Sequence, residues 1–356
     1  MGALYLGVDV GTQGTKAVLY DAAERRIVGA GAAPYELLPT GVPGRAEQKP
    51  STWLEGMKMA IGAALAGVDS SRVKAMAVSG QQHGMVLLDE SGAVVRDAKL
   101  WCDVEAAEEA RIISVSGGFV YPPGFTAPKV LWTKRHEPEA FERVAHVLLP
   151  NSYVNYHLTG RFCIECGDAS GTALLDVARR CWDTAAAARI DERLADWLPP
   201  LIGPEEVVGT LRPEIAAELG LSSNTLVAPG GGDNMMSALG AAAVREGVWI
   251  VSLGTSATLF GHSAHAVLDP SGTVAPFCDC TGAWLPLLCI MNCTAVAEEA
   301  RAAAGLSHAE LTLAAAAVPP GCQGVNFLPY LAGERTPNWP LSGRMSTRNN
   351  RGPGRC

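Results

Sequence analysis

The sequence has no long apolar run, no surplus of basic residues and no dinucleotide-binding glycine pattern, and each absence removes a class of function. Without an uninterrupted apolar stretch, we expect no membrane-spanning segment. Acidic residues outnumber basic ones, 36 to 28, and the net charge of −8 argues against a surface for nucleic acids or anionic membranes. Because no G-x-G-x-x-G opens a helix, a dinucleotide-dependent oxidoreductase is disfavoured. The start of the chain lacks a basic segment followed by an apolar one, so we expect a cytoplasmic protein.

Ten cysteines are present, but their spacing predicts neither a zinc site nor a redox site. Cys163 and Cys166 form a C-x-x-C, whereas Cys278 and Cys280 form a C-x-C, which is not the usual spacing of a zinc finger. A redox C-x-x-C normally opens a helix, and Cys163 instead follows a turn that leads into a strand. We therefore expect reduced thiols and no metal bound by cysteine.

Apolar periodicity predicts an α/β protein of two domains, because 356 residues are many for one core. Alternating apolar residues predict a strand over 4–9, and apolar runs after tight polar turns predict strands over 17–20 and 26–30. Two successive tight hairpins indicate an antiparallel ribbon rather than a βαβ unit. The pattern also predicts a helix over 53–66, a buried strand over 74–78, and helices over 102–113, 137–145 and 296–317.

The first predicted strand carries an acidic residue, Asp9, just before a glycine-threonine turn. An unpaired buried carboxylate is costly, so a strand of this kind normally excludes one. Asp9 either begins the turn, where Asp is common, or has a functional partner.

The turn that follows, Gly11-Thr12-Gln13-Gly14-Thr15, has a counterpart in Gly254-Thr255-Ser256-Ala257-Thr258, which also joins two apolar strands. The separation is far longer than a solenoid repeat of roughly 20–50 residues and suggests a duplicated domain. Two such hairpin tips facing each other would offer N–H groups and hydroxyls to a polyphosphate. The match is short, and chance similarity is the alternative.

Three glycines precede Asp233 and Asn234 at the start of a predicted helix. Asp233 is either an N-cap, which stabilises a helix by about 1 kcal/mol, or a general base that accepts a proton from a substrate hydroxyl. The segment Ser79-Gly80-Gln81-Gln82-His83-Gly84 follows a strand and is either an exposed loop or a polyol-binding loop. Amides and an imidazole recognise neutral sugars well.

The chain resembles the FGGY carbohydrate kinases in five segments: D-V-G-T-Q-G-T-K (9–16), S-G-Q-Q-H-G (79–84), P-G-F-T-A-P-K-V-L-W-T-K-R-H-E-P-E (123–139), G-G-G-D-N (230–234) and S-L-G-T-S (252–256). The resemblance runs from residue 3 to about residue 343. Within the family, the 79–84 loop and the 123–129 stretch favour the branch that acts on D-xylulose over the glycerol kinases. The resemblance implies an actin-like, ribonuclease H-like fold of duplicated domains with a catalytic cleft between them.

The resemblance also implies ATP-dependent phosphorylation of D-xylulose on O5, with Mg²⁺. Asp233 matches the base, and Asp9 matches the carboxylate that holds Mg²⁺-bound phosphate. Gln82, His83 and Asn234 match sugar-binding positions. The phosphate-facing hairpins correspond to Thr12, Thr15, Gly254 and Thr255, and Lys16 either joins them or covers the strand edge.

Two departures from the family pattern are visible. Asp103 is present after Trp101, but Glu105 stands where the family often has Arg, which alters a sugar-side or structural contact. From Arg344 the match ends, and we expect residues 344–356 to be disordered. We expect an N-terminal domain over 1–223 and a partial C-terminal domain over 224–343, lacking the adenosine-binding part and leaving apolar faces uncovered.

Three functions follow as hypotheses. The first is a D-xylulose kinase, and the second is a kinase for another ketose or polyol such as ribulose. The third is a catalytically impaired sugar-binding relic, and we expect at most weak activity from the chain as it stands. The substrates are a sugar and MgATP, with neither nucleic acid nor membrane as a partner, and an assembly of two copies is a further expectation.

Overall fold

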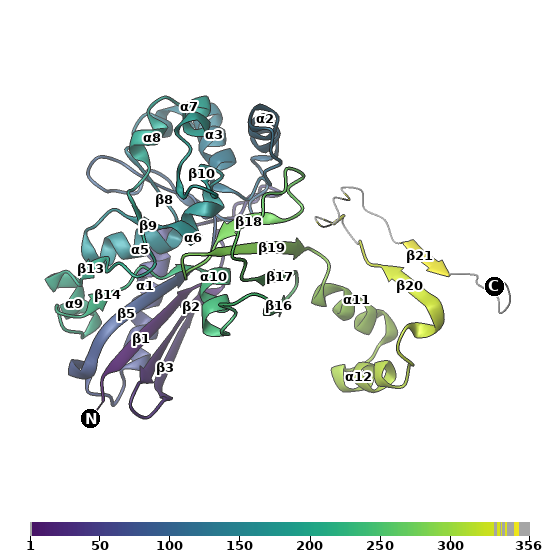
Figure 1. Ribbon diagram of the computed structural model, residues 1–356. Coiled ribbons are helices and arrows are strands. Elements are labelled where there is room, and N and C mark those ends of the chain that lie inside the picture. The colour runs from purple at the N-terminus through teal and green to yellow at the C-terminus, as the bar shows by residue number, and fades with distance from the viewer. Residues whose placement is uncertain (1, 331–332, 335, 337–338, 340–344, 349–356) are drawn as a thin grey trace.

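The computed structural model describes residues 2–330, 333, 334, 336, 339 and 345–348. Figure 1 shows a first sheet near the N-terminus, a group of helices above it, a second sheet beside both, and a C-terminal segment that extends away from them. Among these residues, none of the helices has the length and apolar character needed to cross a bilayer.

The first sheet has seven strands in the order β13-β14-β5-β1-β2-β3, with β15 also paired to β5. Strand β1 is antiparallel to β2, as is β2 to β3, whereas β1, β14 and β15 each run parallel to β5. The predicted antiparallel ribbon is therefore confirmed. The strands are β1 (Leu4–Val10), β2 (Gly14–Asp21), β3 (Arg26–Pro34), β5 (Val73–Gly80), β13 (Gly209–Thr210), β14 (Leu226–Val227) and β15 (Gly231–Gly232).

Helix α1 (Pro50–Ala64) covers one face of this sheet and closely matches the helix predicted over 53–66. It packs on the alternating buried residues of β1, and two helices from later in the chain, α5 (Pro150–Thr159) and α9 (Pro213–Leu219), contribute to the same core. Strand β3 lies very close to α1, because a Cβ atom on Gly29 or Gly31 would collide with backbone carbonyls of the helix. These two glycines allow the close approach.

The helical region holds α2 (Ala107–Gly117), α3 (Thr126–His136), α4 (Pro138–Phe141), α5 (Pro150–Thr159), α6 (Cys166–Ala169), α7 (Thr184–Ile190), α8 (Leu194–Trp197) and α9 (Pro213–Leu219). Short strands lie between them: β4 (Glu47–Gln48), β6 (Val86–Leu88), β7 (Ala98–Lys99), β8 (His146–Leu148), β9 (Ile164–Glu165), β10 (Leu175–Asp176), β11 (Cys181–Trp182) and β12 (Leu201–Ile202). The helix predicted over 102–113 begins five residues later, after a loop held by ion pairs. The one predicted over 137–145 is a single turn.

The second sheet is antiparallel, in the order β16-β17-β19-β18, and follows helix α10 (Asp233–Gly240). Its strands are β16 (Trp249–Leu253), β17 (Ala257–Gly261), β18 (Ala275–Cys278) and β19 (Trp284–Ile290). The hairpin predicted around Gly254 is confirmed. Phe260, Phe277 and Leu285 share a core with Phe125 and Val130 of the helical region, so apolar packing joins the two parts.

The helix predicted over 296–317 is two helices, α11 (Thr294–Ala304) and α12 (His308–Ala316). Gly305 ends the first in a left-handed conformation. Ser307 and Glu310 then form a reciprocal capping box that starts the second.

Strands lie beyond both of the predicted boundaries. Strands β14 and β15 lie beyond residue 223 and still pair with β5 of the first sheet. Within the tail expected to be disordered, β21 (Met345–Arg348) pairs with β20 (Val325–Leu328), whereas residues 344 and 349–356 lie outside the described part. A strand edge needs only backbone partners, so this pairing requires no apolar periodicity in the tail.

Apolar side chains on β16 are uncovered, as expected for this part of the chain. Trp249, Val251 and Leu253 are all more than half exposed. Strand β16 pairs only with β17 within the sheet, so it is an edge strand.

The nine cysteines within the described residues form no disulfide. Cys166 does open a short helix, but Cys163 lies before strand β9. Burial raises the pKa of Cys166 to about 11 and that of Cys278 to about 12. These thiols stay protonated and are poor metal ligands or nucleophiles near neutral pH.

Candidate active site at the strand ends

Three parallel strands of the first sheet end at one edge, and each brings a predicted site residue there. In the register, Asp9 on β1 faces Ser79 on β5, and Ser79 faces Gly231 on β15. The hydroxyl of Ser79 donates to Oδ1 of Asp9 at 2.9 Å. The 81–83 loop follows β5 and Asp233 follows β15, so residues far apart in sequence converge at a typical ligand-binding edge.

Asp233 is the first residue of α10, and Gly232 occupies the N-cap position. The interpretation of Asp233 as the N-cap is therefore wrong by one residue, because the glycine supplies the extended backbone that the cap requires. Its carboxylate still accepts a bond from the N–H of Asn234 at 2.8 Å. Burial, with a further contribution from the charge of Asp9, raises the pKa of Asp233 to about 7. A carboxyl with this proton affinity is suited to general-base catalysis near neutral pH.

Asn234 connects the loop of the first sheet to the second sheet. Its Nδ2 donates to Oε1 of Gln82 at 2.8 Å, and its Oδ1 accepts from the hydroxyl of Thr258 at 3.3 Å. The Nε2 atom of Gln82 is buried and has no hydrogen-bond acceptor among the described residues. A buried amide without an acceptor is costly, so this N–H₂ is a candidate contact for a bound hydroxyl.

His83 adopts a left-handed backbone conformation, with φ at 63°. Its Nδ1 lies 2.9 Å from the carbonyl oxygen of Gly171, which can only accept, so Nδ1 carries the proton. The ring stacks on Phe125 at 4.5 Å between centroids and lies 5.6 Å from the ring of Phe277 on β18. The imidazole is thus fixed in both tautomer and orientation.

The first hairpin is held from several sides. Thr12 accepts a bond on its hydroxyl from Trp101 Nε1 at 2.9 Å and donates to Oε1 of Gln81 at 2.9 Å, while its carbonyl accepts from Gln48. The hydroxyl of Thr15 is buried 3.1 Å from that of Tyr35, so it supports the hairpin from behind.

Lys16 is exposed and lies opposite Asp9 in the ladder between β1 and β2, which puts both side chains on one face. At the tip, the N–H groups of Thr12 and Gln13 have no acceptor among the described residues. Donors of this kind, converging in a turn, suit phosphate oxygens.

The second hairpin carries Gly254 and Thr255 at an exposed tip. The carbonyl of Gly254 accepts bonds from the N–H and the hydroxyl of Thr294, the first residue of α11, at 3.0 and 2.6 Å. The carbonyl of Thr255 accepts from the N–H of Cys293 at 3.2 Å. These contacts leave the hydroxyl of Thr255 on the surface. Thr255 is one of the residues that we expect to face the phosphates.

Three carboxylates near Trp101, those of Glu47, Asp103 and Glu105, lie close enough to hold a metal ion. The ammonium of Lys99 already contacts all three, so the cluster is an ion-pair network. Although burial alone would favour protonation, hydrogen bonds from Arg45 and Lys99 lower the pKa of Glu105 to about 2. Glu105, which stands where the family often has Arg, is therefore held in place by Arg45 and Lys99.

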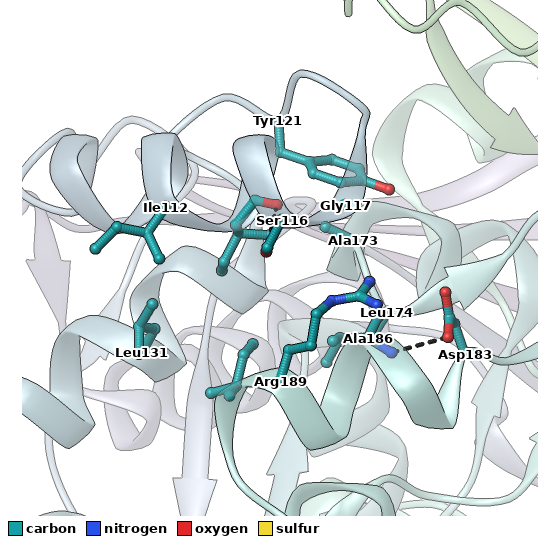
Figure 2. A pocket seen from close by; sticks show the side chains of 12 residues that line it. Ile112, Ser116, Gly117, Tyr121, Leu131, Ala173, Leu174, Asp183, Ala186 and Arg189 are labelled. Carbon is teal, nitrogen blue, oxygen red and sulfur yellow. Dashed lines mark hydrogen bonds between the residues drawn. The ribbon is translucent and has the colours of Figure 1, made fainter.

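A separate small cavity of about 70 Å³ lies between α2, α3 and α7. Figure 2 shows the side chains of Tyr121, Asp183 and Arg189 around it, with Ile112 and Leu131 nearby. Asp183 caps α7 by accepting the N–H of Ala186 at 2.8 Å. None of the predicted site residues lines this cavity.

Comparison with known proteins decides the family. The model of the FGGY family of carbohydrate kinases, N-terminal domain, matches residues 4–240. The chain belongs to the FGGY family of carbohydrate kinases. Xylulose kinase from Haemophilus influenzae is 38% identical over 355 residues, covering 95% of this chain and 72% of the relative. The one from Streptomyces coelicolor is 41% identical, covering 96% and 69%.

Solved structures agree with this family assignment. A "xyloylose kinase" from Brucella ovis superposes with a TM-score of 0.91 at 34% identity, over 98% of this chain and 73% of that one. Xylulose kinase from Bifidobacterium adolescentis gives 0.83 at 31% identity, over 98% and 76%. The predicted actin-like fold and the predicted sugar kinase activity class are confirmed.

Several supporting residues of this FGGY kinase were not predicted as parts of the site. Gln48 contacts Thr12, Trp53 and Gln81 beneath the first hairpin. Lys129 lies within the quoted 123–139 segment, but it received no role. In the sequence, nothing distinguishes Lys129 from the other basic residues of the same helix, Lys134 and Arg135.

Proposed function

We propose that this chain transfers a phosphoryl group from ATP to O5 of D-xylulose. The observation that carries the proposal is Asp233, a carboxyl with a pKa near 7 that lies at the strand-end edge beside the Gln82 and His83 loop. The named activity of relatives that are 38% and 41% identical over most of this chain supports the choice of sugar.

Asp233 acts as the base. As O5 of the sugar attacks the terminal phosphorus of ATP, Asp233 accepts the hydroxyl proton, a role typically worth roughly 10²–10⁴ in rate. Asn234, Gln82 and His83 orient the sugar through amide and imidazole groups. Because their side chains are fixed by the bonds described above, the hydroxyl meets the base without reorganisation of the site.

The two hairpins bind the phosphates of MgATP. The N–H groups of Thr12 and Gln13 and the hydroxyl of Thr255 supply donors, and Lys16 adds positive charge on the face that carries Asp9. The residues fit a hydrated Mg²⁺, because Asp9 is a half-buried carboxylate whose charge acts on a second carboxyl, Asp233. Bound with ATP at Asp9, the ion would neutralise charge on the transferred group.

A panel of sugars tests the proposal. The purified chain is titrated calorimetrically with D-xylulose, D-ribulose and glycerol, and turnover of each with MgATP is followed by ADP release. We expect binding and turnover to favour D-xylulose by at least about tenfold over D-ribulose, since one misplaced hydroxyl costs more than 1 kcal/mol. Asp233→Asn serves as the control that assigns any turnover to this site.

Any other result would support one of two alternative functions. A preference for D-ribulose or glycerol would make the chain a kinase for another ketose or polyol. Sugar binding without turnover would make it a sugar-binding relic. The domain division at residue 223, a cytoplasmic location and an assembly of two copies belong to the same proposal, and size measurement in solution tests the last of these.

A further inference from the structure

Lys129 is a fully buried cation near the start of α3, and its ammonium donates to two backbone carbonyls. Its Nζ lies 2.9 Å from the oxygen of His83 and 2.7 Å from that of Gly124. Burial lowers the pKa of Lys129 to about 7, partly offset by the charge of Asp103. Burying a lysine without a direct carboxylate bond is costly, so the bonds it makes need an explanation.

The bonds of Lys129 hold a strained residue. His83 has φ at 63°, a left-handed conformation that is uncommon for residues other than glycine. Its carbonyl accepts from Lys129 and also from the hydroxyl of Thr126 at 3.2 Å. Phe125, the residue before Thr126, stacks on the imidazole. The first turn of α3 therefore fixes both the backbone and the ring of His83.

The stack extends to the second sheet. Phe277 on β18 lies 6.0 Å from Phe125 with an interplanar angle of 16°. The carbonyl of Gly171 fixes the edge of the same imidazole at Nδ1. A change in the backbone at His83 would therefore move the ring relative to both Phe125 and Phe277.

We propose that Lys129 is a positioning residue that sets sugar affinity by holding the His83 backbone in its left-handed conformation. It does not touch the sugar, because its side chain is fully buried. The inference rests on the proposed function only in assigning His83 to the sugar site.

The test compares two lysines of the same helix. Lys129→Met keeps most of the length of the unbranched side chain and removes both bonds. Lys134→Met is the control on the same helix, because Nζ of the partly exposed Lys134 donates to the carbonyl of Ile190 at 2.6 Å and pairs with Asp191 at 3.0 Å, not with the carbonyl of His83. Both variants are measured for the KM of the sugar, the KM of ATP, kcat and the thermal midpoint.

For Lys129→Met we expect the sugar KM to rise at least about tenfold, with the KM of ATP changed less than about twofold, since two hydrogen bonds from a charged donor are lost. Lys134→Met should leave both KM values within about twofold, whatever its thermal midpoint. The ¹⁵N shifts of the His83 imidazole should move from the Nδ1–H pattern toward that of a solvated histidine in Lys129→Met alone.

A folded Lys129→Met with an unchanged sugar KM, or with equal changes for both substrates, overturns the inference. If that variant does not fold, Thr126→Val removes one bond to the same carbonyl at nearly constant volume. It should raise the sugar KM about twofold to fivefold, and an unchanged value overturns the inference equally. If the panel shows that another sugar is the substrate, the test is run with that sugar, which separates the two failures. If no sugar is turned over, calorimetric affinity replaces KM.

Discussion

The two G-T-x-x-T hairpins have similar sequences and very different surroundings. At the first, Gln48, Gln81 and Trp101 contact Thr12, and Thr15 is buried against Tyr35. At the second, Gly254 and Thr255 are exposed, and the bonds to their carbonyls come from Thr294, which begins α11, and from Cys293 just before it.

The difference shows that the repeated motif determines the turn itself but not which neighbouring residues hold that turn in place. The first hairpin is a rigid wall whose polar groups are satisfied by side chains from several elements. The second depends on one helix start and on the contact between Thr258 and Asn234. Few buried contacts mean a low local stability, so the second hairpin is the part that a bound nucleotide would order most.

The largest expected effect is at Asp233. Its loss of activity is the reference with which changes at the two hairpins are compared. Asp233→Asn keeps the shape and removes the proton acceptor, so kcat should fall by at least roughly a hundredfold while sugar affinity is kept. Steady-state kinetics and calorimetry measure the two quantities. Near-normal turnover would remove Asp233 from the role of base.

The second prediction compares the stability contributed by residues that hold each hairpin in place. Gln48 is buried, and Gln48→Leu deprives Trp53 Nε1 and Gln81 Nε2 of their acceptor, at 2.8 and 3.1 Å. The free energy of unfolding should fall by about 2–4 kcal/mol. Thr294→Val, the counterpart at the second hairpin, should change it by less than about 0.5 kcal/mol, because its bond is exposed. Urea unfolding measures both, and equal losses would contradict the comparison.

The pH profile gives the third prediction. Because the pKa of the Asp233 carboxyl is raised to about 7 and only the ionised form accepts a proton, kcat/KM should rise with pH below about 7 and level off above it. In Asp9→Asn the midpoint of the residual activity should move to lower pH, since the charge of Asp9 favours the protonated form. If the midpoint does not move, the charge of Asp9, on the strand that leads into the first hairpin, has no influence on Asp233.

The smallest expected effects are changes in KM that distinguish the residues that bind ATP from those that bind the sugar. Thr255→Val should raise the KM of ATP several-fold, about the contribution of one hydrogen bond, with little change for the sugar. His83→Ala should do the reverse. If both variants act on the same substrate, the assignment of the second hairpin to phosphates and of the 79–84 loop to sugar is wrong.

Much of this arrangement could be predicted from the sequence, because period-2 patterns and glycine-rich turns are local signals. They placed Asp9, His83 and Asp233 at strand ends. The cap at Gly232 and the break at Gly305 depend on backbone conformation, which single residues indicate only weakly. The roles of Gln48 and Lys129 depend on contacts between residues far apart in the chain, and no local pattern carries that information.

The left-handed backbone at His83 also limits how substrate preference can change over generations. Most residues with a Cβ atom disfavour φ near 63°, and Gly, Asn, Asp and His itself tolerate it best. Few substitutions at this position are therefore accessible without rebuilding the loop. Drift toward a new sugar would more readily pass through neighbours in ordinary conformations, such as Phe125 and Phe277, whose size can vary while the loop stays intact.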